Sequence, residues 1–406
     1  MSPESEADHT GEAALPGTLP EALRAELIEF RRDLHMHPEL GNQEFRTTAA
    51  IKARLEKAGL QPRVLAIGTG LICDIGEWDG GRPMLALRAD IDGLPIPDTK
   101  SDCPYRSTVP DRAHACGHDV HTAAVLGAGL VLAGLLEQGQ LPRPVRLIFQ
   151  PAEEVLPGGA ADVVECGVLE GVGRILAVHC DPKVDAGKIG LRQGAITSAC
   201  DRLEIALDGP GGHTARPHLT TDLVTAAARV VTDVPALVAR RTDARSGLAV
   251  TWGRVESGHA PNVIPQHAEL SGTVRCLDLD TWRQAPDLVV AAIDEVANLH
   301  RAKSEINYVR GVPPVVNDPA ATELLRDAMT ARLGADSVEG TEQSLGGEDF
   351  SWYLEHVPGA MARLGVRAPG DRIGRDLHQG DFDVDESAIA VGVEMFTAAA
   401  LLDAVR

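Results

Sequence analysis

Apolar residues recur at helical spacing in two N-terminal stretches, 21–34 and 45–58, with charged residues between them. A third stretch, 122–136, is apolar throughout, which is typical of a helix buried in a core. Short apolar runs that predict strands occur at 64–67, 71–75, 84–88, 145–149 and 175–178. The last two are nearly continuous apolar runs, interrupted by Arg146 alone, as in strands covered on both faces. This alternation predicts the α/β fold class, specifically an α/β sandwich with a mostly parallel central sheet.

The pattern changes near Ser198. The elements predicted beyond it are a strand at 202–207, a helix at 223–239, strands at 248–252 and 269–274, a helix at 288–299 and a strand at 305–308. This β-α-β-β-α-β order predicts a compact ferredoxin-like α+β module. Because an α/β pattern resumes near residue 320, we expect an insert over 198–310 in a domain formed by 21–197 and 311–406. Residues 1–20 are expected to form a solvated tail.

Composition excludes several kinds of partner. The chain has 38 Lys and Arg against 59 Asp and Glu, a formal net charge of −21, so neither nucleic acid nor an anionic membrane surface is expected. Aromatic residues make up 3% of the chain, which leaves few platforms for stacking bases. The apolar stretch 122–136 is too short to span a bilayer.

Two features indicate the compartment. The first twenty residues lack the apolar core of a signal peptide, and the seven cysteines include no C-x-x-C pair. A disulfide framework is therefore not expected. We expect a cytoplasmic protein in which most thiols are buried.

The segment from His114 to His121, His-Ala-Cys-Gly-His-Asp-Val-His, holds three imidazoles and a thiol just before the apolar helix. Cys116 and His118 are two residues apart, so a regular helix would point them to different sides. On a loop that leads into the helix they can converge on one ion, and a Cys/His pair favours zinc over hard cations. The alternative, capping groups and a buried thiol, stays open on this segment alone.

Further polar residues lie where predicted strands end. Glu153 and Glu154 follow the strand at 145–149, and His179 follows the strand at 175–178. Asp90 lies just beyond the strand at 84–88. Ligands of open α/β sheets collect beyond the carboxyl ends of the strands. Adjacent glutamates suit a division of labour in which one binds a metal and the other transfers a proton. Two solvated loop carboxylates are the alternative.

Nine motifs occur in order along the chain: His35-Met-His-Pro-Glu-Leu-Gly41, Leu87-Arg-Ala-Asp-Ile-Asp92, His114 to His121, Phe149 to Glu154, Gly211-Gly-His-Thr-Ala-Arg-Pro-His218, Pro261-Asn-Val-Ile-Pro265, Gly272-Thr-Val-Arg275, Gly346-Gly-Glu-Asp-Phe350 and Leu377-His378. The set resembles the M20 family of metallopeptidases and amidohydrolases. It is most similar to the branch of N-acyl-amino-acid, hippurate and auxin-conjugate amidohydrolases. The resemblance covers nearly the whole chain beyond residue 20.

The resemblance implies a dinuclear metal site with five ligands: Cys116, His118, Glu154, His179 and His378. Cys116 would be shared between the two ions, and Glu153 would be the general base. Asp90 matches a position that orients a ligand histidine. Zinc is favoured as the cofactor, although such ligands also accept manganese, cobalt or nickel.

For the insert, the resemblance implies a lid and a homodimerisation surface. His213 matches a histidine that reaches the active site of a partner subunit and polarises the scissile carbonyl. Asn262 and Arg275 match lid residues that hold the substrate's carboxylate or carbonyl, and an arginine fork suits a carboxylate. The domain of 21–197 and 311–406 would then be the catalytic, metal-binding domain.

The function implied is hydrolysis of the amide bond of a small N-acyl-L-amino acid, through metal-activated water and a glutamate base. A dipeptidase or carboxypeptidase would use the same residues on a different leaving group. A catalytically silent binding protein is the alternative of another class. This alternative is disfavoured by the presence of Glu153, Glu154 and His213, because a catalytically silent site need not retain a general base.

Overall fold

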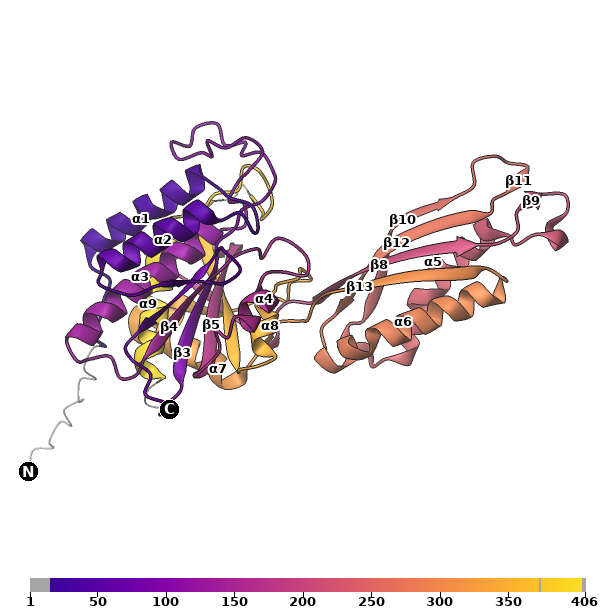
Figure 1. The fold of residues 1–406 in the computed structure, drawn as a ribbon. Helices are drawn as coiled ribbons and strands as arrows, with labels where there is room; N and C mark the ends of the chain where they lie inside the picture. The colour runs from indigo at the N-terminus through magenta and orange to yellow at the C-terminus, as the bar shows by residue number, and fades with distance from the viewer. Residues whose placement is uncertain (1–14, 372–373, 404–406) are drawn as a thin grey trace, which may run out of the picture.

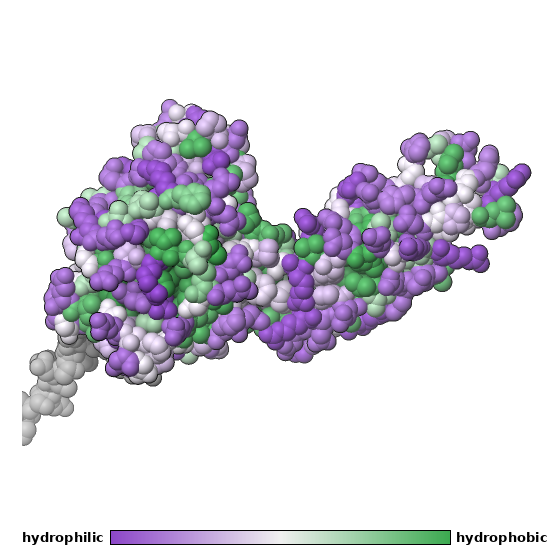
Figure 2. Space-filling view, viewed as in Figure 1, coloured by the Kyte–Doolittle hydropathy of each residue, from purple (hydrophilic) through white to green (hydrophobic). Residues whose placement is uncertain are grey.

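The computed structural model describes residues 15–371 and 374–403. It has two lobes, each built around its own β-sheet and joined by extended chain (Figure 1). We call the part built on the eight-stranded sheet the main lobe and the part built on the four-stranded sheet the inserted lobe. In the space-filling view the waist between them is narrower than either lobe, and the surface is hollowed above it (Figure 2).

The sheet of the main lobe has the strand order β1-β2-β4-β3-β5-β16-β6-β15. The strands are β1 (Arg63–Val64), β2 (Leu71–Ile75), β3 (Met84–Asp90), β4 (Val145–Gln150), β5 (Val172–Asp185), β6 (Ile189–Leu191), β15 (Val338–Gly340) and β16 (Gly359–Arg367). The four central strands, β4, β3, β5 and β16, are parallel, and antiparallel neighbours flank them. The mostly parallel α/β sheet predicted from the sequence is therefore confirmed.

Helices cover both faces of this sheet. One face packs against α1 (Glu21–Met36), α2 (Phe45–Lys57), α3 (His118–Glu137), α7 (Pro319–Leu333) and α9 (Ser387–Leu402). The other face packs against the short helices α4 (Ala160–Glu165) and α8 (Ser351–Leu354). Because both faces are covered, all seven residues of β3 are buried, Arg88 and Asp90 included.

Helix α3 lies in the centre of the helical layer, between α1 and α9. It is long and apolar enough to cross a membrane, but nearly all of its most apolar stretch is buried inside the lobe. It is the core helix that its composition predicted, although it begins at His118, four residues before the predicted start.

The inserted lobe has the β-α-β-β-α-β order predicted for it, with sheet order β10-β12-β8-β13. Its elements are β8 (Ala199–Asp208), α5 (Leu223–Arg241), β10 (Ala249–Ser257), β12 (His267–Cys276), α6 (Leu279–Leu299) and β13 (Lys303–Val312). The helices α5 and α6 pack on one face, so buried and exposed residues alternate along β8 and β12. A small two-stranded sheet, β9 (Gly212–His213) with β11 (Val263–Ile264), lies at the end farthest from the main lobe (Figure 1).

Short elements complete the chain: the two-stranded pair β7 (Gly194–Ala195) and β14 (Val316–Asn317), and the 3-10 turns Pro217–Leu219, Ala244–Ser246 and Ala335–Ser337. Of the expected tail, residues 1–14 lie outside the described residues. Residues 15–20 lie against the main lobe, where Arg332 donates to the backbone oxygen of Leu15 at 2.8 Å.

Candidate metal centre

Cys116 and His118 are placed by the turn that begins α3. Gly117 between them is the N-cap residue and has the left-handed φ of 90°, so the chain bends sharply there. This bend removes the regular helical spacing and turns both side chains to one side. A Cβ atom on Gly117 would lie 2.6 Å from the Sγ atom of Cys180, so only glycine fits.

Glu153 and Glu154 lie in the turn that follows β4, as predicted. The turn begins at Ala152, whose φ of 61° is in the left-handed region. The buried carboxylate of Glu44 accepts a hydrogen bond from the backbone N–H of Ala152 at 2.8 Å. Glu44 therefore fixes the unusual backbone from which both glutamates project.

His179 and His378 come from two other parts of the main lobe. His179 lies inside β5, which continues to Asp185, and not at a strand end as the sequence suggested. His378 has a φ of 63° and is held by a hydrogen bond from its backbone N–H to the oxygen of Ala115 at 2.8 Å. That bond ties the loop of His378 directly to the segment that carries Cys116.

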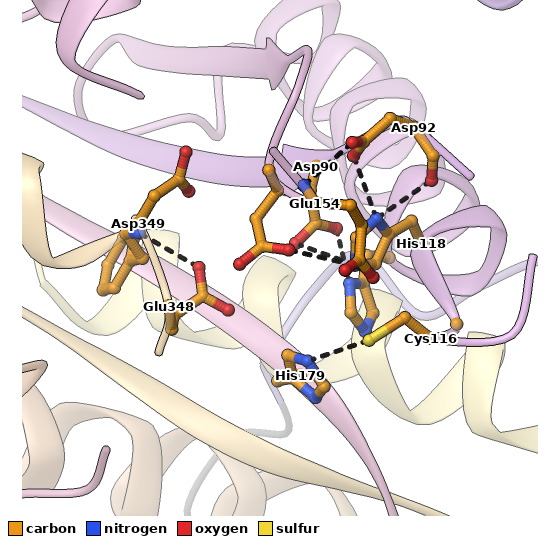
Figure 3. A network of polar contacts seen from close by, with 12 residues as sticks. Asp90, Asp92, Cys116, His118, Glu154, His179, Glu348 and Asp349 are labelled. Atoms are coloured by element: carbon orange, nitrogen blue, oxygen red, sulfur yellow. Dashed lines mark hydrogen bonds and ion pairs between the residues drawn. The ribbon is translucent and has the colours of Figure 1, made fainter. Parts of the chain in front are cut away.

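Ligand atoms of these five side chains lie close together. Figure 3 shows four of them, Cys116, His118, Glu154 and His179, around one region. Three groups of ligand atoms within 4.8 Å of one another contain two or more of the five: Cys116 with His118 and His179, Cys116 with Glu154 and His378, and His118 with Glu153 and Glu154. His118 also belongs to a group with Asp90 and His121. Cys116 belongs to two of these groups. The geometry suits two ions that share one thiolate ligand.

The donor atoms fit a divalent cation. Nε2 of His118 and Oε1 of Glu154 are buried and have no hydrogen-bond partner among the described residues. The other ring nitrogens of the two buried histidines are engaged, since Nδ1 of His118 lies 3.0 Å from the backbone oxygen of Asp92 and Nδ1 of His179 lies 2.8 Å from that of Cys180. Each ring therefore turns Nε2 toward the site, the arrangement typical of metal-binding histidines.

The pKa values reflect a crowded anionic site. Burial, followed by the charge of Glu154, raises the pKa of the Cys116 thiol well above its usual range. Burial and the charge of Arg363 lower the pKa of His179, which keeps its ring neutral as a ligand must be. Burial, followed by the neighbouring carboxylates of Glu348 and Glu154, raises the pKa of Glu153 well above its usual value. Ligand groups of this kind bind a cation with release of protons.

The orienting role predicted for Asp90 is wrong for the ligand histidines. Asp90 Oδ1 lies 2.6 Å from Nδ1 of His121, which is not among the five ligands, and its Oδ2 is 3.7 Å from Nε2 of His118. The carboxylate beside Nδ1 of His118 is Asp92, at 3.2 Å. Asp92 also accepts from the backbone N–H of Glu154 at 2.9 Å. Asp90 closes β3, whereas Asp92 lies beyond the strand end, where it reaches the first turn of α3.

A second buried polar network lies beside Glu153. Arg88, which is fully buried, donates to Asp90 at 2.8 Å and to Asp349 at 2.7 Å, and it lies 3.2 Å from Glu348. Glu153, Glu348 and Asp349 bring oxygens within 4.8 Å of one another. Glu348 and Asp349 belong to the motif Gly346-Gly-Glu-Asp-Phe350. Their link to Arg88 could not be read from the sequence, because it joins residues 261 positions apart.

A cavity of about 330 Å³ opens onto this centre. The side chains that line it include four of the five predicted ligands, together with Glu153, Glu348, Arg275 and Arg363. Arg275 extends from the inserted lobe, and its Nη1 donates to the backbone oxygen of Leu345 at 2.6 Å. The structure therefore brings Arg275 to the site of its own subunit.

His213 and Asn262 are not brought to this cavity. Both are exposed, and both lie at the far end of the inserted lobe with β9 and β11 (Figure 1). The backbone N–H of Thr214 donates to the oxygen of Asn262 at 3.2 Å, so the two residues belong to one small unit. The resemblance grouped Asn262 with Arg275, but within one subunit the structure separates them.

Comparisons with known proteins show the family of this chain. The model of peptidase family M20/M25/M40 matches residues 86–402. The chain is 39% identical to an N-acetyl-L-cysteine deacetylase of Bacillus subtilis, over 90% of this chain and 85% of that protein. It is also 47% identical to a putative glutamate–cysteine ligase of Rhodococcus jostii, over 93% of this chain but only 46% of that protein, so it spans about half of that relative.

Among solved structures, the chain is similar to the YXEP protein of Bacillus subtilis, described as a dinuclear metal-binding peptidase from the M20 family. The TM-score is 0.80 at 34% identity, and the match covers 95% of this chain and 99% of the other. Fold, motif order and clustered ligand atoms agree with these matches. The chain belongs to peptidase family M20 and is a hydrolase of that family.

Proposed function

We propose that this protein is a metal-dependent amidohydrolase that cleaves N-acyl-L-amino acids to a carboxylic acid and a free amino acid. The observation that carries the proposal is the convergence of five ligand-type side chains beside a largely buried glutamate that is not among them. Cys116, His118, Glu154, His179 and His378 would hold two divalent ions, with Cys116 shared. Bound ions would supply Lewis acidity toward the carbonyl and make water acidic at neutral pH.

Glu153 is proposed as the proton-transfer group. Its carboxylate lies 3.9 Å from Nε2 of His118 and lines the cavity. Glu153 takes a proton from the attacking water, a C–O bond forms at the amide carbon, and the C–N bond breaks as Glu153 returns the proton to the nitrogen. The raised pKa of Glu153 suits a base that must later act as an acid.

We propose that the working unit is a homodimer formed through the inserted lobe. His213 and Asn262 lie exposed at the tip of that lobe, far from the cavity of their own subunit. A second copy of the chain would bring them to its partner's site, where His213 would polarise the carbonyl. Arg275 would hold the substrate's carboxylate or carbonyl within its own subunit.

The soft donors support zinc as the native metal, with manganese, cobalt or nickel also compatible. All seven cysteines are free thiols, which supports the proposed cytoplasmic location. A thiolate ligand of this kind needs a reducing environment to stay available.

A panel of N-acetyl and N-benzoyl amino acids, assayed at defined metal content, tests the proposal. Hydrolysis that depends on added metal and is lost in Glu153→Gln is expected. Glu153→Gln should lower turnover by about 10²–10⁴-fold while metal content holds, because it removes the base and keeps its size. Binding without hydrolysis of any amide would contradict the proposal and favour a silent binding protein.

A dipeptidase on the same scaffold is a second candidate, and one observation favours it. Oε2 of Glu348 is buried beside the cavity and has no hydrogen-bond partner among the described residues. It suits the ammonium group of a free dipeptide, which an N-acyl amino acid lacks. Unblocked dipeptides belong in the same panel, and faster hydrolysis of these than of their N-acetyl forms would select this candidate.

A further inference from the structure

Arg363 is a buried cation without a partner. It lies in the central strand β16, is 6% exposed and lines the cavity of the metal centre. Within the described part of the chain, no carboxylate oxygen lies within 4.0 Å of its guanidinium and no hydrogen bond engages it. By contrast, the equally buried Arg88 has three acceptors.

The sheet register places Arg363 beside a candidate metal ligand. Its Cα atom is paired with that of His179 across the parallel strands β16 and β5. Side chains at paired positions project from the same face of a sheet. The guanidinium therefore stands beside a predicted ligand, and the charges of Asp181, Glu348 and Cys116 act on it without an ion pair.

Burying an unpaired guanidinium is energetically unfavourable, because no ion pair compensates for its desolvation. An anion that enters the cavity and accepts hydrogen bonds from the guanidinium offsets this unfavourable free energy. A carboxylate matches the planar fork of a guanidinium in two parallel bonds. An N-acyl amino acid carries one such group, on the carbon next to the scissile nitrogen.

We propose that Arg363 binds the carboxylate of the amino acid half of the substrate, within the cavity of its own subunit. This inference rests on the proposed function and specifies its substrate class as amides with a free α-carboxylate. Arg275 is less suited to that role, because its Nη1 already donates to Leu345. Arg275 would then hold the carbonyl group of the substrate.

The test pairs two substrates with two variants. N-benzoylglycine and its carboxamide have nearly the same shape and differ in the charge that Arg363 would bind. In Arg363→Gln, kcat/KM for N-benzoylglycine should fall by about 10²-fold while that for the carboxamide hardly changes. Arg363→Lys should lie between, since it keeps the charge and loses the fork. Arg367→Gln, on the same strand but paired with Asp185, is the control and should leave both substrates unaffected.

Equilibrium binding separates this inference from the proposed function. The metal-loaded wild type should bind N-benzoylglycine at least 10-fold more tightly than the carboxamide, and Arg363→Gln should bind the two alike. If the wild type shows that preference and hydrolyses neither, the proposed function fails and the assignment of Arg363 stands. If hydrolysis is seen but the preference is absent, or survives in Arg363→Gln, the assignment is wrong.

Stability distinguishes binding from a structural role. Because Arg363 has no partner to lose, Arg363→Gln should keep the wild-type melting temperature or exceed it. A large fall in melting temperature, with both substrates affected equally, would overturn the proposal.

Discussion

Asp92 contacts two candidate metal ligands at once. Its backbone and carboxylate oxygens lie 3.0 and 3.2 Å from Nδ1 of His118, and its other carboxylate oxygen accepts the backbone N–H of Glu154 at 2.9 Å (Figure 3). Asp92 thereby fixes the ring of one ligand and the backbone of another. Its position beyond β3 lets one side chain hold the turn after β4 against the first turn of α3.

Asp92→Ala should therefore weaken metal binding by about 10–100-fold, the usual cost of losing a group that orients ligands. Competition with a chelator of known affinity measures this directly. Asp185→Ala removes a carboxylate at the end of β5 that is paired with Arg367, and serves as the control. Equal metal affinity in the two variants would show that Asp92 does not orient the ligands.

Gly117→Ala should destabilise the chain. The left-handed backbone alone costs about 1–2 kcal/mol for a residue with a Cβ atom, and the contact with Cys180 adds to it. Gly134→Ala, in the interior of the same helix with open space around its Cβ position, should instead stabilise by about 0.5–1 kcal/mol. Urea denaturation of the metal-free chains measures both, and effects of the same sign would contradict this account of the turn.

Glu44 predicts a pH dependence of stability. Its carboxyl is fully buried, with one oxygen bound to Ala152 and the other without a partner among the described residues. Burial, with a smaller contribution from Asp92, raises the pKa of Glu44 from 4.5 to about 7. The folded state then holds more protons between these values, so the contribution to stability is complete below pH about 4.5 and is lost as the pH rises through about 7.

Glu44→Gln removes this titration and keeps the shape of the protonated group. The free energy of unfolding of the metal-free wild type, measured relative to the variant, should fall by about 2–3 kcal/mol between pH 5 and pH 8. A difference that stays constant across this range would mean that Glu44 titrates near its ordinary value.

The proposed dimer predicts complementation between two inactive variants. Glu153→Gln lacks the base and His213→Ala lacks the histidine contributed to the other subunit. After subunit exchange, a mixed dimer would contain one intact site, so about a quarter of wild-type activity should return. Recovery is absent if His213 serves its own subunit or has no role. Size-exclusion chromatography with light scattering checks that both variants remain dimers.

The sequence predicted the elements that have strong periodicity. Helix α3 and the buried strands β3 and β4 appear close to where apolar stretches predicted them. Helix α6 begins at Leu279, nine residues before the prediction, and Pro286 lies inside it. Both helix starts, those of α3 and α6, were predicted too late because the first turn of each helix is polar and does not show the apolar periodicity of a helix.

The five candidate ligands were named from the sequence through the family resemblance, whose motifs are local. Arg363 and Asp92 were not recognised, because their significance depends on which strands are neighbours. Arg363 meets His179 only through the pairing of β16 with β5, across more than 180 residues of chain. Asp90 and Asp92 are alike in the sequence, and only the end of β3 decides which of them reaches His118.

The central claim, a dinuclear centre held by Cys116, His118, Glu154, His179 and His378, is tested most directly by anomalous diffraction from crystals of the zinc-loaded protein. Two anomalous peaks per chain are expected, with Cys116 beside both. Peaks elsewhere, such as between Asp90 and His121 or among Glu153, Glu348 and Asp349, or no peak at these five residues, would contradict it.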